Sequence, residues 1–417
     1  MQLGKFSFGT GDRFSHQGTA QLSAILRARA ELGVVVTPVW NKSNREHNIV
    51  HSEPVETRRA ADAAVKTLGY GGCYFVDADH INLGNVDRFI DHADFFTLDV
   101  ADFIGKPATP AEIEAFVAEH RYLIGQLSIP GIENAFPVSE AFLERFAAKF
   151  LLATQEAAKI FRHIAGKKGV GNFVTEVSMD EVDEAQTPLD LLFILKSLAD
   201  LRVPVQTIAP KFTGRFNKGV DYVGDVAQFS QEFEDDLLVI DYAVDHFGLP
   251  SGLKLSVHSG SDKFSIYPVI GRLIRKYDKG IHVKTAETSW LEEVIGLALA
   301  GDDGLALAKS IYVQAYGRQA ELCAPYAAVI DIRGEELPAP ATVEAWSGER
   351  FAAMLQHEPG NPHFDPGARQ LIHVGYKVAA ELGATYVEAL ERHHEVIARC
   401  VAGNIYDRHL RRLFVVE

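Results

Sequence analysis

Residues that could bind a metal ion or move a proton recur at the ends of short apolar runs in this sequence. The pair Asp79-His80 follows one such run, His258 follows another, and Glu176 lies near the end of a third. Neutral imidazole is a good ligand for Zn²⁺, Ni²⁺, Mn²⁺ or Co²⁺, and a carboxylate can complete an open site. We therefore predict that His80 and His258 bind a divalent metal ion with Glu176 as the third ligand. His282, inside a further apolar run, is the alternative third ligand.

Carboxylates and cations near these residues could supply the remaining chemistry. General acid–base catalysis needs a group within hydrogen-bond reach of the reacting atoms, and we predict that Asp79 and Glu176 share this role. Each residue also has a structural interpretation, because an aspartate at a strand end often caps a helix and a lysine usually lies in solvent. The side chains that we expect to bind substrate are Lys211, Ser259, Asp262, Lys263 and Lys284. Weaker candidates for this role are Arg13, Arg45, Arg215 and the segment Asn41–Ser43.

Eight short runs rich in β-forming residues could be the strands that position these groups. Several are almost continuously apolar, as in VVVTPV and LKLSVH, which is typical of parallel strands covered on both faces. Helical periodicity lies between the runs, so the pattern predicts an α/β fold with a parallel sheet. The runs are Lys5–Phe8, Gly33–Val39, Gly72–Asp77, Asp94–Leu98, Asn172–Val177, Val203–Ile208, Leu253–Val257 and Ile281–Val283.

The number of runs favours a closed (β/α)8 barrel of the TIM type, although an open doubly wound sheet also fits. Such barrels build their active sites at the carboxyl ends of the strands, where most of the candidate residues fall. We expect residues 1–300 to form a catalytic barrel domain with a helical insertion at about 105–168. Residues 301–417 are expected to form a mainly helical extension that packs on the barrel or on another subunit.

The composition of the chain and the motifs that it lacks indicate which partners, cofactors and cellular compartments to expect. The net charge of −15 argues against binding to nucleic acids or anionic membranes, and no apolar run approaches the ~20 residues of a membrane helix. The three cysteines are isolated and no secretory signal pattern is seen, so we expect a reducing, cytoplasmic location. Neither a complete GxGxxG nor a GxxxxGK[ST] motif occurs. A nicotinamide-dependent enzyme or a P-loop kinase is therefore disfavoured.

Long stretches of the sequence resemble the tagaturonate epimerase family, and together they cover most of the chain. They are GDRF (Gly11–Phe14), FTLDVADFIG (Phe96–Gly105), APKFTGRFNKGVDYVGD (Ala209–Asp225), LKLSVHSGSDKFSIYPVIGRL (Leu253–Leu273), IHVKTAETSWLE (Ile281–Glu292) and NIYDRHLRRLF (Asn404–Phe414). A fainter resemblance is to class II metal-dependent aldolases, whose Asp-His pair and later His-Gly-Gly-Ser segment are similar to Asp79-His80 and His258–Ser261. On that analogy His80 and His258 bind the metal ion while Asp79 moves a proton.

The first resemblance implies a metal-dependent enzyme that interconverts tagaturonate and fructuronate, so that its partner is a small sugar acid. The carbon inverted in that reaction is β to the ketone, and its C–H bond is too weakly acidic for simple deprotonation. Because no nicotinamide motif exists to support transient oxidation, retro-aldol cleavage and re-addition is the expected route. The alternatives are a class II-type aldolase, a metal-dependent ketose isomerase and, from a different class, a sugar-acid-binding protein without catalysis.

Overall fold

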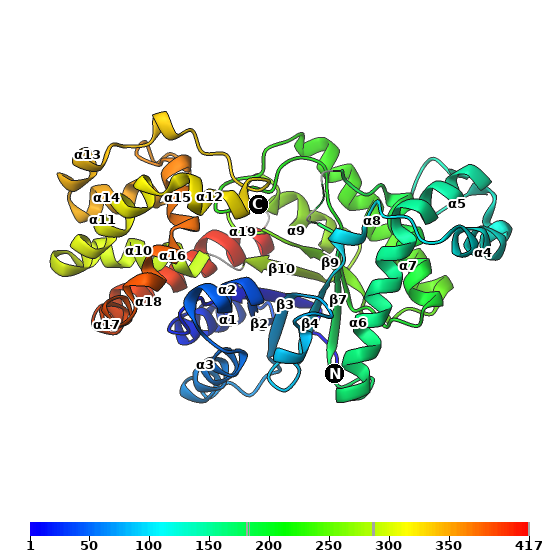
Figure 1. Ribbon diagram of the computed structural model, residues 1–417, viewed down its shortest axis with the longest axis horizontal. Coiled ribbons are helices and arrows are strands. Elements are labelled where there is room, and N and C mark those ends of the chain that lie inside the picture. Colours follow the sequence, from blue (N-terminus) through cyan, green and yellow to red (C-terminus); the bar gives the residue numbers. More distant parts are fainter. Residues whose placement is uncertain (181, 183, 286–287, 416–417) are drawn as a thin grey trace.

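Eight parallel strands close into a barrel in the computed structural model of the chain (Figure 1). The structure describes residues 1–180, 182, 184–285 and 288–415. Around the barrel the strands follow the order β1-β10-β9-β8-β7-β4-β3-β2. The ring closes because Phe6 of β1 pairs with Ile281 of β10 on one side and with Val36 of β2 on the other. The barrel strands are β1 (Phe6–Gly11), β2 (Val36–Ser43), β3 (Phe75–Ile81), β4 (Phe95–Asp99), β7 (Val174–Ser178), β8 (Thr207–Ala209), β9 (Lys254–Val257) and β10 (Ile281–Thr285).

Each barrel strand overlaps one of the eight runs in the sequence, so the predicted (β/α)8 barrel is confirmed and the open sheet is excluded. Strand side chains alternate between the barrel interior and the surrounding helices. Five apolar side chains form a small core cluster of their own among the barrel strands: Leu3, Val39, Phe75, Phe95 and Val174. The residues two positions further along β3 and β7 are the acids Asp77 and Glu176, both buried. The barrel therefore has an apolar floor and a charged interior above it.

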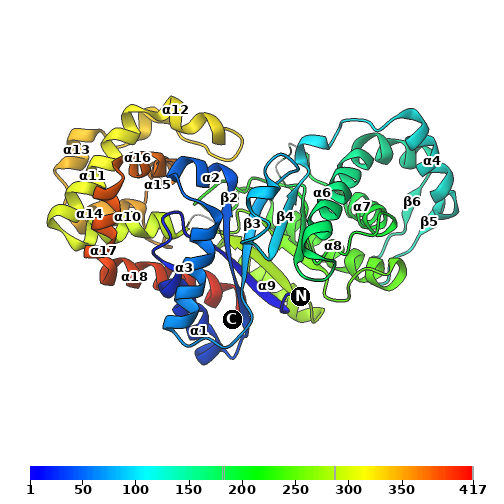
Figure 2. The ribbon, with the colours of Figure 1, turned by 60° about the horizontal axis from the view of Figure 1, so that its bottom comes forward.

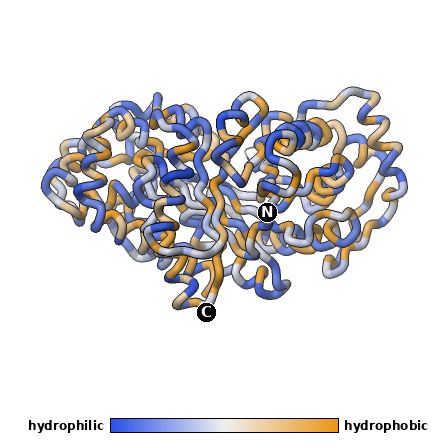
Figure 3. The backbone as a smooth tube through the Cα atoms, turned by 90° about the horizontal axis from the view of Figure 1, so that it is seen from below, coloured by the Kyte–Doolittle hydropathy of each residue, from blue (hydrophilic) through white to orange (hydrophobic). Residues whose placement is uncertain are grey.

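Helices surround the barrel, and several of them begin at a capping signal. Ser43, Thr109 and Thr187 each accept the backbone N–H of the residue three positions later, which satisfies a donor at the helix start. Hydrophobic and hydrophilic stretches alternate along the outer helices, as expected where one face is buried (Figure 3). The helices that follow the barrel strands are α1 (Gly18–Leu32), α2 (Asn44–Val50), α3 (Pro54–Thr67), α6 (Leu152–Lys168), α7 (Pro188–Asp200), α8 (Val226–Phe247), α9 (Tyr267–Lys276) and α10 (Thr288–Ala300).

An insertion separates β4 from α6 and projects from one side of the barrel (Figure 2). It contains the helices α4 (Pro110–His120) and α5 (Glu140–Phe146), and a π-helical turn, Ala147–Leu151, leads into α6. A two-stranded antiparallel hairpin, β5 (Gly125–Leu127) with β6 (Phe136–Val138), lies between the two helices. The sequence predicted helices over residues 105–168 but did not predict this hairpin.

The opposite side of the barrel carries a lobe built from helices of the carboxyl-terminal region (Figure 2). α10 belongs to this lobe, because it packs on α11, α14 and α18. Among the described residues, no helix combines the length and the apolarity that a membrane crossing requires. The helices of the lobe are α11 (Asp302–Gly317), α12 (Gln319–Cys323), α13 (Pro340–Glu344), α14 (Gly348–Leu355), α15 (Pro366–Val374), α16 (Tyr376–Leu382), α17 (Ala384–Arg392) and α18 (His394–Gly403).

The end of the chain takes the place that the eighth barrel helix would have. A π-helical segment, Asn404–Leu410, and α19 (Arg411–Phe414) contact both α1 and α9, the helices that flank the seam between β1 and β10. The ring of Phe414 packs edge-on against Phe6 of β1, with 4.9 Å between the centroids. Because α10 packs in the lobe, α19 and the π-helical segment before it cover the barrel at this seam.

Candidate metal centre and active site

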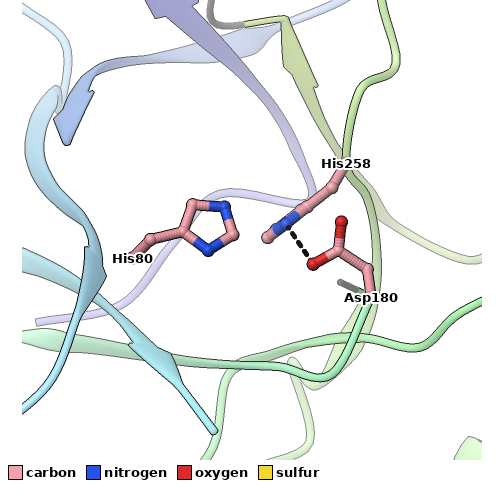
Figure 4. Close-up of side chains that lie close together, drawn as sticks. All are labelled: His80, Asp180 and His258. Atoms are coloured by element: carbon pink, nitrogen blue, oxygen red, sulfur yellow. Dashed lines mark ion pairs between the residues drawn. The ribbon is translucent and has the colours of Figure 1, made fainter. Parts of the chain in front are cut away.

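His80, Asp180 and His258 lie together at the carboxyl ends of the barrel strands (Figure 4). His80 belongs to β3, His258 follows β9 directly, and Asp180 lies two residues after β7. One ligand atom from each side chain lies within 4.8 Å of the other two, and the two imidazole centroids are 5.4 Å apart. Two imidazoles and a carboxylate form a suitable donor set for a divalent metal ion. Within the described part of the chain, this is the one group of three side chains placed to share an ion.

The backbone of β3 is irregular where it carries these residues. Asp79 and His80 both line the same cavity, although consecutive strand residues normally point to opposite faces. The pairing of β3 with β4 shifts in register between Ala78 and Ile81, and His80 has a positive φ of 50°. This irregularity allows two neighbouring side chains to reach the barrel mouth, as bulges often do beside active sites.

The ring of His258 lies between two carboxylates. Its Nε2 is 2.8 Å from Glu176 Oε1, and its Nδ1 is 3.3 Å from Asp180 Oδ1. An ionised Glu176 can only accept, so Nε2 carries a hydrogen. A cation bound at Nδ1 beside Asp180 would require that nitrogen to lose its hydrogen and would leave the remaining ring hydrogen on Nε2. Glu176, the predicted third ligand, thus lies behind the His258 ring, and Asp180 completes the group of three. A carboxylate behind a metal-binding histidine commonly fixes its tautomer and orientation.

The charges around His258 set its protonation. Burial alone would lower the pKa of His258, but the neighbouring carboxylates, Asp180 first, outweigh burial and raise that pKa to about 9. Burial also opposes ionisation of the two carboxyls. Lys284 and His258 nevertheless hold the pKa of Glu176 well below its usual range, and His258 does the same for the pKa of Asp180. A cation at this position would compete with the His258 proton, because metal ligands must be deprotonated.

Lys284 joins three carboxylates inside the barrel, next to this group. Its Nζ is 2.9 Å from Asp77 Oδ2, 2.9 Å from Asp79 Oδ1 and 2.8 Å from Glu176 Oε1. The long side chain fits because Gly9 of β1 stands opposite, where a Cβ atom would lie 3.2 Å from Lys284 Cγ. The ammonium group therefore connects the residue behind His258 with a carboxylate that faces the cavity.

The same contacts decide which of these groups is charged. Burial opposes charge on Lys284, but the three carboxylates outweigh it and raise its pKa well above the usual value. Asp79 is also buried, yet Lys284 and the two histidines lower its pKa. Burial raises the pKa of Asp77 to about 7, with further repulsion from the other two acids. At neutral pH Asp79 is thus an ionised carboxylate at the cavity wall.

A cavity lies directly above the metal group and contains part of the predicted substrate-binding set. Ser259 and Lys284 line it, and so do the weaker candidates Arg13, Arg45 and Ser43. Three residues that the sequence did not single out complete the wall: Glu46, Lys218 and Tyr326.

A second cavity adjoins the first. Arg45, Asp180, Lys218 and Tyr326 line both cavities, and the predicted residue Lys211 lies in the second one. Arg215 lines it as well. Four cationic side chains give this side of the site a local positive charge on an acidic protein, which suits an anionic ligand.

Three further candidates lie outside these cavities. Asp262 is fully buried and pairs with Arg369 of α15, with 2.6 Å from Arg369 Nη2 to Asp262 Oδ2. The Lys263 ammonium donates to three backbone carbonyls, those of Asn217, Val220 and Ser261. His282 lies inside the barrel away from the metal group, where its Nδ1 is 2.9 Å from Ser7 Oγ and its ring packs on Phe95. Burial lowers the pKa of His282 to about 3.

The sequence offered different signals for the residues that it missed. Asp180 lies just beyond a predicted strand, so its position pointed to the barrel mouth, but its facing direction depends on the loop that carries it. Lys218 lies in the segment between β8 and α8, and only its position after a strand was informative. Tyr326 comes from the carboxyl-terminal lobe, and no local pattern indicates that this segment reaches the barrel mouth.

A closed (β/α)8 barrel with histidines and carboxylates gathered at the carboxyl ends of its strands defines a barrel enzyme. The family model of tagaturonate epimerase matches residues 1–413. The chain therefore belongs to the tagaturonate epimerase family, and it is an isomerase of the epimerase type.

Known relatives match along nearly the whole chain. The tagaturonate/fructuronate epimerase of Thermotoga maritima is 28% identical over 420 residues, which cover 97% of this chain and 80% of the relative. A crystal structure of the fructuronate-tagaturonate epimerase of Cohnella laeviribosi with one glycerol has a TM-score of 0.83 at 24% identity, covering 99% of this chain and 82% of that one. A structure of the same enzyme with two glycerols has a TM-score of 0.80 and covers 100% and 83%. At this identity the two structures show that the fold is shared.

Proposed function

We propose that this epimerase interconverts tagaturonate and fructuronate with the help of a divalent metal ion held by His80, Asp180 and His258. The observation that carries the proposal is the convergence of these three side chains on one cavity, in a chain of this family. Zn²⁺, Ni²⁺, Mn²⁺ and Co²⁺ all suit two imidazoles and a carboxylate. We also propose that the barrel, residues 1–300, is the catalytic domain and that residues 301–417 are an extension packed on it.

The chemistry of the reaction favours cleavage of a carbon–carbon bond. With the ketone at C2, the inverted carbon is C4, which is β to the ketone and has no acidic hydrogen. Breaking the C3–C4 bond leaves an enediolate on one fragment and an aldehyde at C4 on the other. Rotation of the aldehyde and re-addition to its opposite face invert C4. A divalent cation would polarise the ketone and stabilise the negative charge of the enediolate.

Asp79 is the residue best placed to move the proton of the C4 hydroxyl. It lines the cavity, its carboxylate is ionised at neutral pH, and Lys284 holds its Oδ1 at 2.9 Å. A carboxylate in this position can accept the hydroxyl proton during cleavage and return it during re-addition. Glu176 is fully buried and is not part of the cavity wall, so we assign it to the orientation of His258.

The second cavity is suited to the carboxylate end of the substrate. Lys211, Lys218 and Arg45 line it within the same wall that carries Asp180, and cations of this kind recognise carboxylates. Asp262 and Lys263, which the sequence placed in the substrate set, are fully buried among protein groups. We therefore assign those two residues to the support of the loop after β9.

The metal requirement is tested by stripping the purified enzyme with a chelator and adding back each candidate cation. We expect activity to disappear and to return with one or more of the four ions. His80→Ala and His258→Ala should lose both metal binding and turnover. His394→Ala, which alters an exposed histidine of α18, is the matched control and should behave as wild type. Full activity of either site variant in metal-free buffer would refute the proposal.

The cleavage step is tested with substrate that carries deuterium at C4. Retro-aldol chemistry leaves this C–H bond intact, so the product should keep the label and the rate should show no primary deuterium isotope effect. Transient oxidation or deprotonation at C4 would break the bond and produce such an effect. A ¹³C isotope effect at both C3 and C4 would support the proposed bond cleavage.

A further inference from the structure

Two segments that are distant in sequence meet above the metal group. One is the connection between β8 and α8, which carries Lys218, and the other follows α12 in the carboxyl-terminal lobe and carries Tyr326. They are joined by a backbone hydrogen bond, in which the Lys218 N–H donates to the Val329 carbonyl at 2.9 Å. The lobe therefore contributes directly to the wall of the cavity.

The ring of Tyr326 is held in place on more than one side. Its hydroxyl is 2.9 Å from the hydroxyl of Tyr376 in α16, and the side chain is 5% exposed. The guanidinium of Arg45 in α2 lies 4.8 Å from the ring centroid, within the range of a cation–π contact. Tyr376 itself is covered by the guanidinium of Arg13 at 3.7 Å. A ring fixed in this way is a rigid part of the wall.

Tyr326 also stands where the two cavities meet. It is one of four residues shared by the cavity above the metal group and the adjoining cavity that contains Lys211. The other three shared residues are charged, so Tyr326 supplies the aromatic surface of this junction. The ring therefore borders the boundary between the metal group and the second cavity.

The proposed reaction has a particular need at this point. When the C3–C4 bond breaks, its electron pair passes to the enediolate, and the C4 hydroxyl proton passes to Asp79, which leaves an aldehyde at C4. Re-addition reverses both transfers and consumes no water or other reactant. Between the two steps the aldehyde fragment is bound by no covalent bond, and its escape would turn the epimerase into an aldolase.

We propose that Tyr326 is the specificity-determining residue that retains the aldehyde fragment between cleavage and re-addition. The inference rests on the proposed retro-aldol route. It also assigns a function to the carboxyl-terminal lobe, which supplies Tyr326 to the cavity wall. The ring and the Arg45 guanidinium that lies against it narrow the junction, while the cations of the second cavity hold the fragment's carboxylate. Retention then favours rotation and re-addition over release.

The test compares the products of wild type with those of Tyr326→Ala, Tyr326→Leu and Tyr326→Phe. Reactions are quenched with borodeuteride, and mass spectrometry gives the ratio of three-carbon fragments to epimerised six-carbon acid. We expect a severalfold rise in this ratio for Tyr326→Ala and a smaller rise for Tyr326→Leu. Tyr326→Phe keeps the ring and should stay near wild type.

Tyr376→Phe is the matched control. It removes the same hydroxyl–hydroxyl hydrogen bond but alters a residue outside the cavity wall, so the product ratio should not change. An unchanged ratio in a folded, active Tyr326→Ala or Tyr326→Leu would overturn the inference. Failure of the retro-aldol route is recognised separately, because wild type would then show a primary deuterium isotope effect at C4.

Discussion

His258 contacts a carboxylate through each of its ring nitrogens, and the two contacts have different consequences. Glu176 accepts from Nε2 at the buried side, whereas Asp180 lies beside Nδ1 and forms the metal group together with His80 and His258. A cation shared with His80 would meet Nδ1 and Asp180, and Glu176 would act on it only through the imidazole. Neutralising Asp180 would remove a direct metal ligand, whereas neutralising Glu176 would only disturb the orientation of the His258 ring. The two substitutions can therefore distinguish the two roles.

We expect Asp180→Asn to weaken metal binding more than Glu176→Gln does. Loss of a direct ligand removes a metal bond, while loss of a partner behind a ligating histidine typically costs about 10–100-fold in metal affinity. Titration calorimetry of the stripped variants with Zn²⁺ or Co²⁺ measures both effects, with His394→Ala as the reference. The reverse order, with Glu176→Gln the weaker binder, would show that Glu176 is the third ligand after all.

The sequence was informative about which residues gather at the barrel mouth and less informative about how they face. His80, His258, Asp79 and Lys284 come from strand ends, and the closed barrel brings strand ends together. The direction of His80 depends on the register shift in β3, which arises from pairing with β4 and has no local sequence signal. Lys263 shows the opposite case, because its ammonium turns away from the cavity to satisfy three backbone carbonyls.

At the scale of elements, the terminal segment Asn404–Phe414 has a role that its position in the chain does not suggest. It covers the seam of the barrel between α1 and α9, in place of α10. Leu410 of this segment is fully buried, whereas Val415, just past its end, is 42% exposed. The contrast allows the structural contribution of the segment to be measured with single substitutions.

Leu410→Ala should lower the free energy of unfolding by about 2–5 kcal/mol, as expected for a buried leucine whose removal leaves a cavity. Val415→Ala should change it by less than about 0.5 kcal/mol, because the side chain is exposed. Urea unfolding followed by circular dichroism gives both values. Equal, small effects would mean that the segment is not part of the cooperative barrel structure.

Strand and helix positions were predictable because each depends on a local pattern, and the eight apolar runs marked the strands directly. The hairpin β5–β6 lacks such a pattern, since its strands are three residues long and partly exposed. The terminal segment, and not α10, lies between α1 and α9. Which of the two occupies this place depends on how well each packs against the barrel and the lobe. That competition is decided by tertiary contacts, so periodicity alone could not reveal it.

At the scale of the whole molecule, a buried acid links the barrel to the carboxyl-terminal lobe. Glu293 of α10 is 1% exposed, and its carboxyl accepts from Gln17 at the start of α1 and from the Tyr386 hydroxyl of α17. Burial raises the pKa of Glu293 to about 8, and repulsion from Asp12 adds to the effect, although the hydrogen bonds from Tyr386 and Gln17, and then the charge of Arg13, oppose it. We therefore expect ionisation of Glu293 to make the stability of the protein depend on pH.

The sign of the pH dependence follows from the two states. The unfolded carboxyl has a pKa of 4.5, so between pH 4.5 and about 8 the folded protein binds the proton that the unfolded chain releases. The stability that this proton contributes is complete below pH 4.5 and is lost as the pH rises, by up to about 1.4 kcal/mol per pH unit.

Glu293→Gln is neutral at every pH and lacks this loss. Urea unfolding of wild type and variant from pH 5.5 to 8.5 should show a difference that grows in favour of the variant. Glu388→Gln alters an exposed glutamate and is the control, so its stability difference from wild type should not change with pH. A pH-independent difference for Glu293→Gln would mean that the folded carboxyl is already ionised at pH 5.5.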